Sequence, residues 1–250
     1  MAAIHSLDSI QRKGKRVTGS KQIIAIGGAG FLSKHGSPAL ETYLLSQARK
    51  PNPAVCFIPT ATGDSAKYIA RFYAALKKHR CRPSHLPFFG RTPELRKLIL
   101  QQDLIYVGGG NTKSMLAVWR EWQLPKILRE TWKAGTVLAG ISAGAICWFD
   151  AGVTDSWAEH LAPLDCLGWL PGGCCPHYNS EKERRPAVHE FVAKGLIPRT
   201  LALDDGAAAH FVGRKLARVI AWRAKAGAYS VQREGRQAME TPLPVTYLRK

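Results

Sequence analysis

Short apolar runs alternate with segments of helical spacing along residues 22–141 of this chain. In the segment 65–78, for example, Tyr68, Phe72 and Leu76 recur at intervals that place them on one helix face. This alternation predicts a doubly wound, mostly parallel α/β sheet. Strands are predicted at 23–26, 54–59, 83–89, 104–107 and 136–139, and helices at 38–49, 65–78, 93–101, 113–119 and 124–134.

The pattern changes after residue 200. A strand at 200–203 is followed by short runs at 210–212, 216–222 and 228–232, with Gly213-Arg214 as a turn. These runs predict a C-terminal antiparallel hairpin region, and we expect residues 243–250 to form a tail. Residues 1–21 are polar and basic and predict a flexible N-terminal tail, which leaves 22–250 as a single α/β domain.

Loops rich in small residues follow three of the predicted strands, at 27–30, 60–64 and 108–112. Sites in doubly wound sheets lie beyond the carboxyl ends of the strands. The first loop lacks the Gly-x-Gly-x-x-Gly spacing of a nucleotide site, because Ser33 stands where the last glycine belongs, and no Walker lysine follows it. We therefore interpret 27–30 as a tight turn that binds no cofactor.

The run Gly140-Ile141-Ser142-Ala143-Gly144 lies between two apolar segments, 136–139 and 145–149. This pattern predicts a strand, a sharp turn and a helix, with Ser142 at the apex as a candidate nucleophile. Small residues at a turn also occur where a loop only has to be tight, so the pattern alone leaves both interpretations open.

A serine nucleophile needs a base, an acid and an oxyanion hole. His177 is the best candidate base, because Pro176 restrains the residue before it and places the histidine in a fixed loop. Asp205 follows an apolar strand and Asp155 follows the segment after the serine, and either can be the acid. The backbone N–H groups of Gly109 and Ala143 are the predicted oxyanion hole.

Composition limits the alternatives. A zinc site at Cys166, Cys174, Cys175 and His177 is disfavoured, because no Cys-x-x-Cys occurs and adjacent cysteines fit a tetrahedral site poorly. The six cysteines show no disulfide framework, and no apolar run has the length of a membrane span, so we expect a cytoplasmic protein. The net charge of +18 is spread along the chain, which argues against a specific nucleic-acid site and favours a solvated basic surface, which can also steer acidic substrates.

Four motifs occur in a fixed order along residues 22–232. They are Val107-Gly108-Gly109-Gly110-Asn111-Thr112, Gly140-Ile141-Ser142-Ala143-Gly144-Ala145, Pro176-His177-Tyr178 and Leu203-Asp204-Asp205-Gly206. Together they resemble the peptidase E family of serine peptidases, which includes aspartyl dipeptidases and, more distantly, cyanophycinases. Four motifs in order are far more specific than any single one.

The resemblance implies a fold related to the class I glutamine amidotransferases, with serine at the position of their cysteine. It implies that Ser142 is the nucleophile and His177 the base. The acid of the family corresponds to Asp205, where the family has glutamate in a Leu-Pro-Glu-Gly motif, or to Asp155 after the serine turn. We expect Asp205, since the end of a strand is the more rigid support.

The resemblance also implies residues that bind substrate. An arginine after the histidine binds the aspartyl side chain in the dipeptidases, and Arg184 is the nearest match in this chain. Asn111 and Thr112, in the glycine loop motif, are predicted to contact substrate as well.

The sequence thus predicts a serine exopeptidase or dipeptidase that cleaves short peptides through an acyl-enzyme, with a preference for N-terminal aspartate. The expected mechanism uses no metal and no cofactor. The expected partners are short peptides, and we expect no binding to specific nucleic acid or to a membrane. The sequence leaves open whether the protein forms a homodimer. The alternatives are another acyl hydrolase on the same scaffold, an amidase or esterase, and a non-catalytic basic α/β binding protein.

Overall fold

The parallel sheet predicted from the first half of the chain is present in the computed structural model, which describes residues 21–30, 38–48, 50–157 and 159–248. Its parallel part has the strand order β1-β5-β4-β2-β3 and belongs to an eight-stranded sheet. This order places the carboxyl ends of β1, β5 and β4 next to one another. The bounds of the strands are β1 Gln22–Ile26, β2 Ala54–Ile58, β3 Arg82–His85, β4 Leu104–Val107 and β5 Val137–Ile141.

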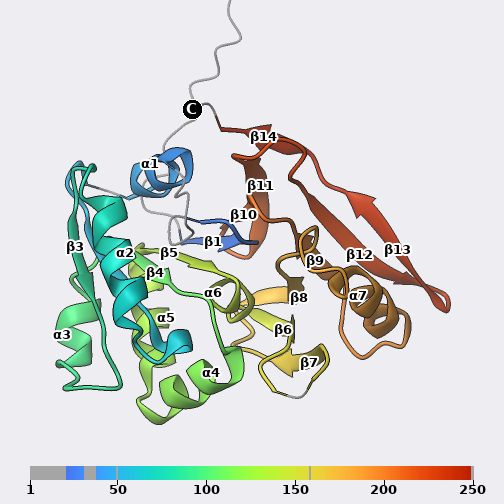
Figure 1. Cartoon of the computed structure of the whole chain (residues 1–250), viewed down its shortest axis with the longest axis horizontal. Coiled ribbons are helices and arrows are strands. Elements are labelled where there is room, and N and C mark those ends of the chain that lie inside the picture. Colours follow the sequence, from blue (N-terminus) through green and yellow to red (C-terminus); the bar gives the residue numbers. More distant parts are fainter. Residues whose placement is uncertain (1–20, 31–37, 49, 158, 249–250) are drawn as a thin grey trace, which may run out of the picture.

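Helices cover both faces of this sheet (Figure 1), which is the doubly wound arrangement that the sequence predicts. Alternate residues of a strand point to opposite faces. Ile23 therefore packs with α4 and α5, whereas Ile24 packs with α1 and α2. The bounds of the helices are α1 Pro38–Ser46, α2 Ala66–Leu76, α3 Leu95–Ile99, α4 Thr112–Glu121 and α5 Leu124–Ala134, with a 3₁₀ turn at Thr60–Thr62.

Antiparallel strands extend the sheet beyond β1. β10 (Ala207–Val212) pairs antiparallel with β1, and β11 (Lys215–Ala221) pairs with β10 through the predicted turn at Gly213-Arg214. The prediction of a tail over 243–250 is wrong, because β14 (Val245–Tyr247) pairs with β11. So short a strand has no sequence pattern of its own, and its pairing with β11 holds it in place.

A second sheet, which the sequence analysis did not predict, has the order β13-β12-β9-β8-β6-β7. The segment 145–149 was expected to be helical, but α6 ends at Ile146 and β6 begins at Phe149. A short apolar run fits a buried strand as well as a helix, so the sequence pattern cannot decide between them. Helix α7 packs on β12 and β13 (Figure 1). The bounds are α6 Ala143–Ile146, β6 Phe149–Thr154, β7 Ala162–Asp165, β8 Leu170–Cys175, α7 Arg184–Ala193, β9 Thr200–Leu203, β12 Ala228–Glu234 and β13 Gln237–Pro242.

Buried tryptophans connect the second sheet to the helices of the first. The ring centroids of Trp148 and Trp169 are 5.3 Å apart, and Trp148 lies 6.2 Å from Trp119 on α4. Trp148 immediately precedes β6 and Trp169 precedes β8, so the cluster fixes these strands against α4. The ends of β8 and β9 thereby reach the end of β1, where Gly28 and Asp205 form a β-bridge.

Two expectations about the whole chain stay predictions. The predicted basic tail lies outside the described residues except for Lys21, and the single domain over 22–250 is not tested. Within the described ranges, none of the helices has the length and the apolar character that crossing a membrane requires. The cytoplasmic location also stays a prediction.

Candidate active site

Ser142 lies on a strained turn between β5 and α6. Its backbone has φ 55° and ψ −114°, a positive-φ conformation that costs a non-glycine residue about 1–3 kcal/mol. Backbone contacts hold it there: the Ser142 N–H donates to the Ile26 carbonyl at 3.1 Å, and the Ser142 carbonyl accepts from the Ala145 N–H at 2.8 Å. A Cβ at Gly144 would lie 2.4 Å from the Val107 carbonyl oxygen, so this close approach of helix and strand requires glycine.

His177 and Asp205 form a hydrogen-bonded pair just beyond the ends of β8 and β9. His177 Nδ1 lies 2.8 Å from Asp205 Oδ1. Burial alone would raise the pKa of Asp205, but the hydrogen bond and charge of His177, with Ser180 and Arg223, lower it below its ordinary value. An ionised Asp205 accepts the Nδ1–H of the imidazole, which leaves Nε2 as the nitrogen that can take a proton.

The loop that carries His177 is held from both sheets. His177 has a positive φ of 55°, which is uncommon for a residue other than glycine. Its N–H donates to the Gly27 carbonyl at 3.2 Å, and the N–H of Tyr178 donates to the Leu203 carbonyl at 3.1 Å. The position of the candidate base therefore depends on the turn after β1 and on the end of β9.

Gly28 lies directly against the His177–Asp205 pair. A Cβ at Gly28 would lie 1.8 Å from Asp205 Oδ1 and 2.6 Å from His177 Nδ1. The Gly28 carbonyl also accepts the N–H of Gly206, next to Asp205, at 3.1 Å. Sequence reasoning interpreted this glycine run as a tight turn that binds no cofactor, and it missed that Gly28 makes room for the His177–Asp205 pair.

Ser142 and His177 line one pocket, with a volume of about 300 Å³. Among the described residues, no hydrogen bond joins the Ser142 hydroxyl to His177. Catalytic hydrogen bonds are often long without substrate and tighten in the reacting complex, so this geometry is compatible with proton transfer.

The predicted oxyanion donors lie beside the serine. A Cβ at Gly109 would lie 3.0 Å from Ser142 Cβ, which shows how closely the loop after β4 approaches the turn. Nearby N–H groups of this loop already have acceptors: Gly108 N–H donates to the Ile58 carbonyl, and Asn111 N–H donates to the Ala61 carbonyl. The N–H of Ala143 is the first of α6 and therefore has no acceptor within its own helix. Both N–H groups can face a developing oxyanion.

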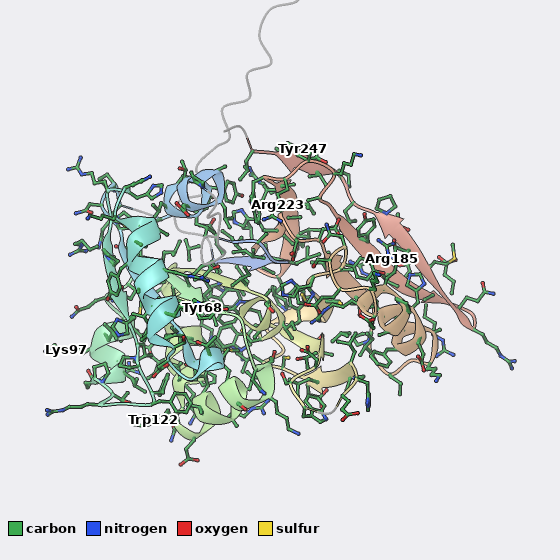
Figure 2. All side chains as sticks on the ribbon, viewed as in Figure 1. Tyr68, Lys97, Trp122, Arg185, Arg223 and Tyr247 are labelled. Carbon is green, nitrogen blue, oxygen red and sulfur yellow. The ribbon has the colours of Figure 1, made fainter. Side chains whose placement is uncertain are left out.

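Arg71 and Tyr68, on α2, line the same pocket and were not among the predicted site residues. The guanidinium carbon of Arg71 lies 5.8 Å from the centroid of the Tyr68 ring, and Figure 2 shows Tyr68 over α2. The two residues are three positions apart, which places them on one side of the helix. This spacing was the only available signal, and it does not distinguish a pocket wall from a solvated helix face.

The structure does not bring Arg184 or Asp155 to this pocket. Arg184 is 3% exposed, and its guanidinium donates to Glu181 and to the Val153 carbonyl. The Asp155 carboxylate is 69% exposed and lies 3.9 Å from Arg184. Arg184 begins α7, whose N-terminal turn faces β6 rather than the serine, and a loose sequence match could not fix that direction.

Asn111 and Thr112 also contact protein rather than the pocket. Asn111 Oδ1 accepts from the Ser114 N–H at 2.8 Å and so caps α4, while its Nδ2 donates to the Ser156 carbonyl. The Thr112 N–H donates to the Ser156 hydroxyl, and the side chain of Thr112 is buried. These contacts start α4 and hold the loop around Ser156, and the predicted contacts of Asn111 and Thr112 with substrate stay predictions.

In the part of the chain that the structure describes, no three His, Cys, Asp or Glu side chains gather where they could hold a metal ion. Cys174 and Cys175 are both buried, and burial raises the pKa of the Cys175 thiol to about 12. A thiol with so high a pKa is a poor source of the thiolate that zinc binds.

Comparison with known proteins places the chain in a family. The sequence model of peptidase family S51 matches residues 23–219, which is most of the chain and includes Ser142, His177 and Asp205. The chain belongs to this family. It is therefore a serine-type peptidase, as the motif resemblance to peptidase E predicted.

Individual relatives agree with this assignment. An uncharacterized peptidase of Bacillus subtilis, YgaJ, is 49% identical over 229 residues, which cover 91% of this chain and 99% of that protein. Peptidase E of Pasteurella multocida is 30% identical over 139 residues, which cover 52% of this chain and 59% of that protein. The alignment with that peptidase E thus spans only about half of this member of the S51 family.

Solved structures confirm the fold. A peptidase from an acI-B1 actinobacterium superposes with a TM-score of 0.65 at 18% identity, over 89% of this chain and 94% of the other. A putative peptidase E from Listeria monocytogenes gives a TM-score of 0.60 at 19% identity, over 90% and 100%. The α/β fold predicted for this S51 peptidase is thereby confirmed.

Proposed function

We propose that this S51 peptidase is an exopeptidase that cleaves short peptides with Ser142 as nucleophile, His177 as base and Asp205 as the acid that orients it. One observation carries the proposal: Ser142 and His177 line a single pocket although they follow strands of different sheets, and His177 is hydrogen-bonded to Asp205. The exposed Asp155 makes no contact of this kind.

The reaction follows from the geometry. Ser142 attacks the scissile carbonyl while His177 Nε2 takes the hydroxyl proton and later gives it to the leaving amine. The N–H groups of Gly109 and Ala143 donate to the oxyanion of the tetrahedral intermediate. The amine leaves an acyl-enzyme on Ser142, and water, deprotonated by His177, then releases the acid product. Asp205 holds the imidazole in the required tautomer throughout.

The size and the charge of the pocket favour short acidic substrates. Its volume of about 300 Å³ is at the lower end of the range for small-ligand sites, which fits one residue of a peptide better than an extended chain. Arg71 supplies a cation to the pocket, and a guanidinium can hold a carboxylate with two hydrogen bonds. In this proposal the preference for N-terminal aspartate is moved from Arg184 to Arg71.

A fluorophosphonate probe and a matched dipeptide panel test the proposal. The unmutated protein should be labelled at Ser142, and Ser142→Ala should lose labelling together with about 10⁴-fold or more of the hydrolytic rate while remaining folded. Dipeptides that begin with aspartate should be cleaved faster than the isosteric asparagine peptides, and acetylation of the N-terminal amine should abolish cleavage. A folded Ser142→Ala protein that keeps most of its activity contradicts the serine mechanism. Equal kcat/KM for the aspartate and asparagine peptides contradicts only the acidic pocket.

A further inference from the structure

A polar network joins the β12–β13 hairpin to the loop that carries His177. The Tyr178 hydroxyl donates to Glu240 Oε2 at 2.6 Å, and His189 Nε2 lies 2.9 Å from the same oxygen. The guanidinium of Arg185 bonds the other carboxylate oxygen of Glu240. Figure 2 shows Arg185 where α7 meets the hairpin. Glu240 thus connects β13, α7 and the residue that follows His177.

The network is packed as well as charged. The guanidinium carbon of Arg185 lies 4.4 Å from the centroid of the Tyr178 ring and 4.9 Å from that of Tyr229. Burial alone would raise the pKa of Glu240, but its bonds from Tyr178, His189 and Arg185 lower it below its ordinary value. The carboxylate is therefore ionised at neutral pH, and it accepts a charge-assisted hydrogen bond from Tyr178.

Tyr178 transmits this anchoring to His177. Its side chain is 2% exposed and belongs to the core of the second sheet, with Val188 and Val231. Its backbone N–H is bonded to Leu203, so both ends of the residue are fixed. A positive-φ residue such as His177 keeps its conformation only where the surrounding contacts enforce it. A tyrosine fixed at its ring and its backbone is one such contact.

We propose that Glu240 is a positioning residue, which holds His177 in place against Ser142 by anchoring the hydroxyl of Tyr178. The inference rests on the proposed function for the role of His177. Glu240 lies beyond residues 23–219, which the family model matches, so the β12–β13 hairpin adds to the site from outside that region.

A double-mutant cycle tests the inference, with Tyr178→Phe and Glu240→Ala as single variants. The first readout is the rate at which a fluorophosphonate inactivates the protein, separated into its maximal rate and its half-saturating concentration. Each single variant should slow the maximal rate about tenfold, less than the roughly 100-fold of a 1 Å misplacement, with little change in half-saturation. The double variant should be no slower, because both changes remove one hydrogen bond. Glu240→Gln, which can still accept from Tyr178, should recover most of the rate.

The second readout does not depend on activity. The proton that His177 Nδ1 shares with Asp205 should give a downfield NMR resonance, which should shift or broaden in Tyr178→Phe and Glu240→Ala. Met239→Ala, an exposed neighbour of Glu240 on β13, is the matched control and should leave both readouts unchanged. If Glu240→Ala does not fold, Tyr178→Phe, which removes only one oxygen, carries the test.

The outcomes are distinct. Unchanged inactivation rates and an unchanged resonance in folded Tyr178→Phe overturn the positioning role, as do losses that add in the double variant. If the unmutated protein is not labelled by the probe but the resonance still shifts in the variants, the proposed function fails and the positioning of His177 by Glu240 stands.

Discussion

Ser142 follows β5 in the parallel sheet, whereas His177 and Asp205 follow β8 and β9 in the second sheet. The geometry of Ser142 is set by its own turn and by the first sheet, because its N–H bonds the carbonyl of Ile26 on β1 and Gly144 packs against Val107 on β4. The His177–Asp205 pair instead joins residues 28 positions apart and lies against Gly28, in the turn after β1.

The comparison teaches that two parts of one site can depend on the chain in different ways. The contacts that hold the turn lie within the first sheet, so Ser142, the proposed nucleophile, should tolerate substitutions in the second sheet. The proposed base and acid depend on packing between the sheets, so distant changes should disturb them. Substitutions in and around both halves of the site test this difference, in order from the largest expected effect to the smallest.

Changing Asp205, the proposed acid, should break the half of the site that the second sheet carries. We expect Asp205→Asn to lose about 10⁴-fold in kcat, because asparagine keeps the size of the side chain but favours the wrong imidazole tautomer. Asp155→Asn is the matched control, since Asp155 is exposed and contacts Arg184 only at 3.9 Å, and it should stay within about twofold. Steady-state kinetics on both variants decide the acid, and a larger loss in Asp155→Asn reverses the assignment.

A methyl group at Gly28 should displace the His177–Asp205 pair without changing the chemical groups of either side chain. The new Cβ would overlap Asp205 Oδ1, so the pair has to move by about an ångström, and we expect kcat to fall about 100-fold. Gly90→Ala is the control, because nothing lies within 4 Å of a Cβ there. The rate of fluorophosphonate labelling should fall with kcat. Full activity in a folded Gly28→Ala protein would show that the pair does not need its present position.

Replacing Arg71, a cation that lines the pocket, tests the half of the site that the first sheet carries. Arg71→Met should raise KM about tenfold for dipeptides that begin with aspartate, since a hydrogen bond to a charged group is lost, and should leave the asparagine equivalents nearly unchanged. Lys67→Met, an exposed cation on the same helix that does not line the pocket, should behave like the unmutated enzyme. A similar rise in KM for both peptides would mean that Arg71 shapes the pocket without recognising charge.

The smallest effect concerns the seam between β1 and β10. Burial, with the charge of Arg218, lowers the pKa of His210 to about 4, and its ring nitrogens bond Tyr43 and Gln22. Its folded pKa lies below the ordinary value of about 6.5, so the unfolded chain binds the proton more readily. Stability should therefore be full above about pH 6.5 and fall by on the order of 2 kcal/mol as pH drops toward 4.

Urea unfolding across this pH range measures the effect. His210→Gln should remove much of the decline while lowering stability at pH 8, since it loses part of the hydrogen bonding. A decline of the same size in His210→Gln would assign the pH dependence to other groups.

The sequence by itself determined the parallel half of the molecule and the turn that carries Ser142. The strands around β1, β4 and β5 are continuous apolar runs, and their alternation with helices has one common solution. The glycines around Ser142 let the strand and the helix approach closely, and few other conformations of the turn fit this contact. Ser142 and His177 could be named before the fold was known, from the serine turn, from Pro176 and from the four ordered motifs, which left Asp205 and Asp155 as alternatives for the acid.

Only the tertiary structure decided which side chains contact one another at the site. In the structure, Asp205 rather than Asp155 is hydrogen-bonded to His177. Arg184 is buried and bonds the carbonyl of Val153, whereas Arg71 lines the pocket. These choices depend on how two sheets and their helices pack, and sequence spacing carries no information on that. Glu240 reaches the loop of His177 for the same reason: its contacts are made across the fold, by a strand that the sequence pattern left unassigned.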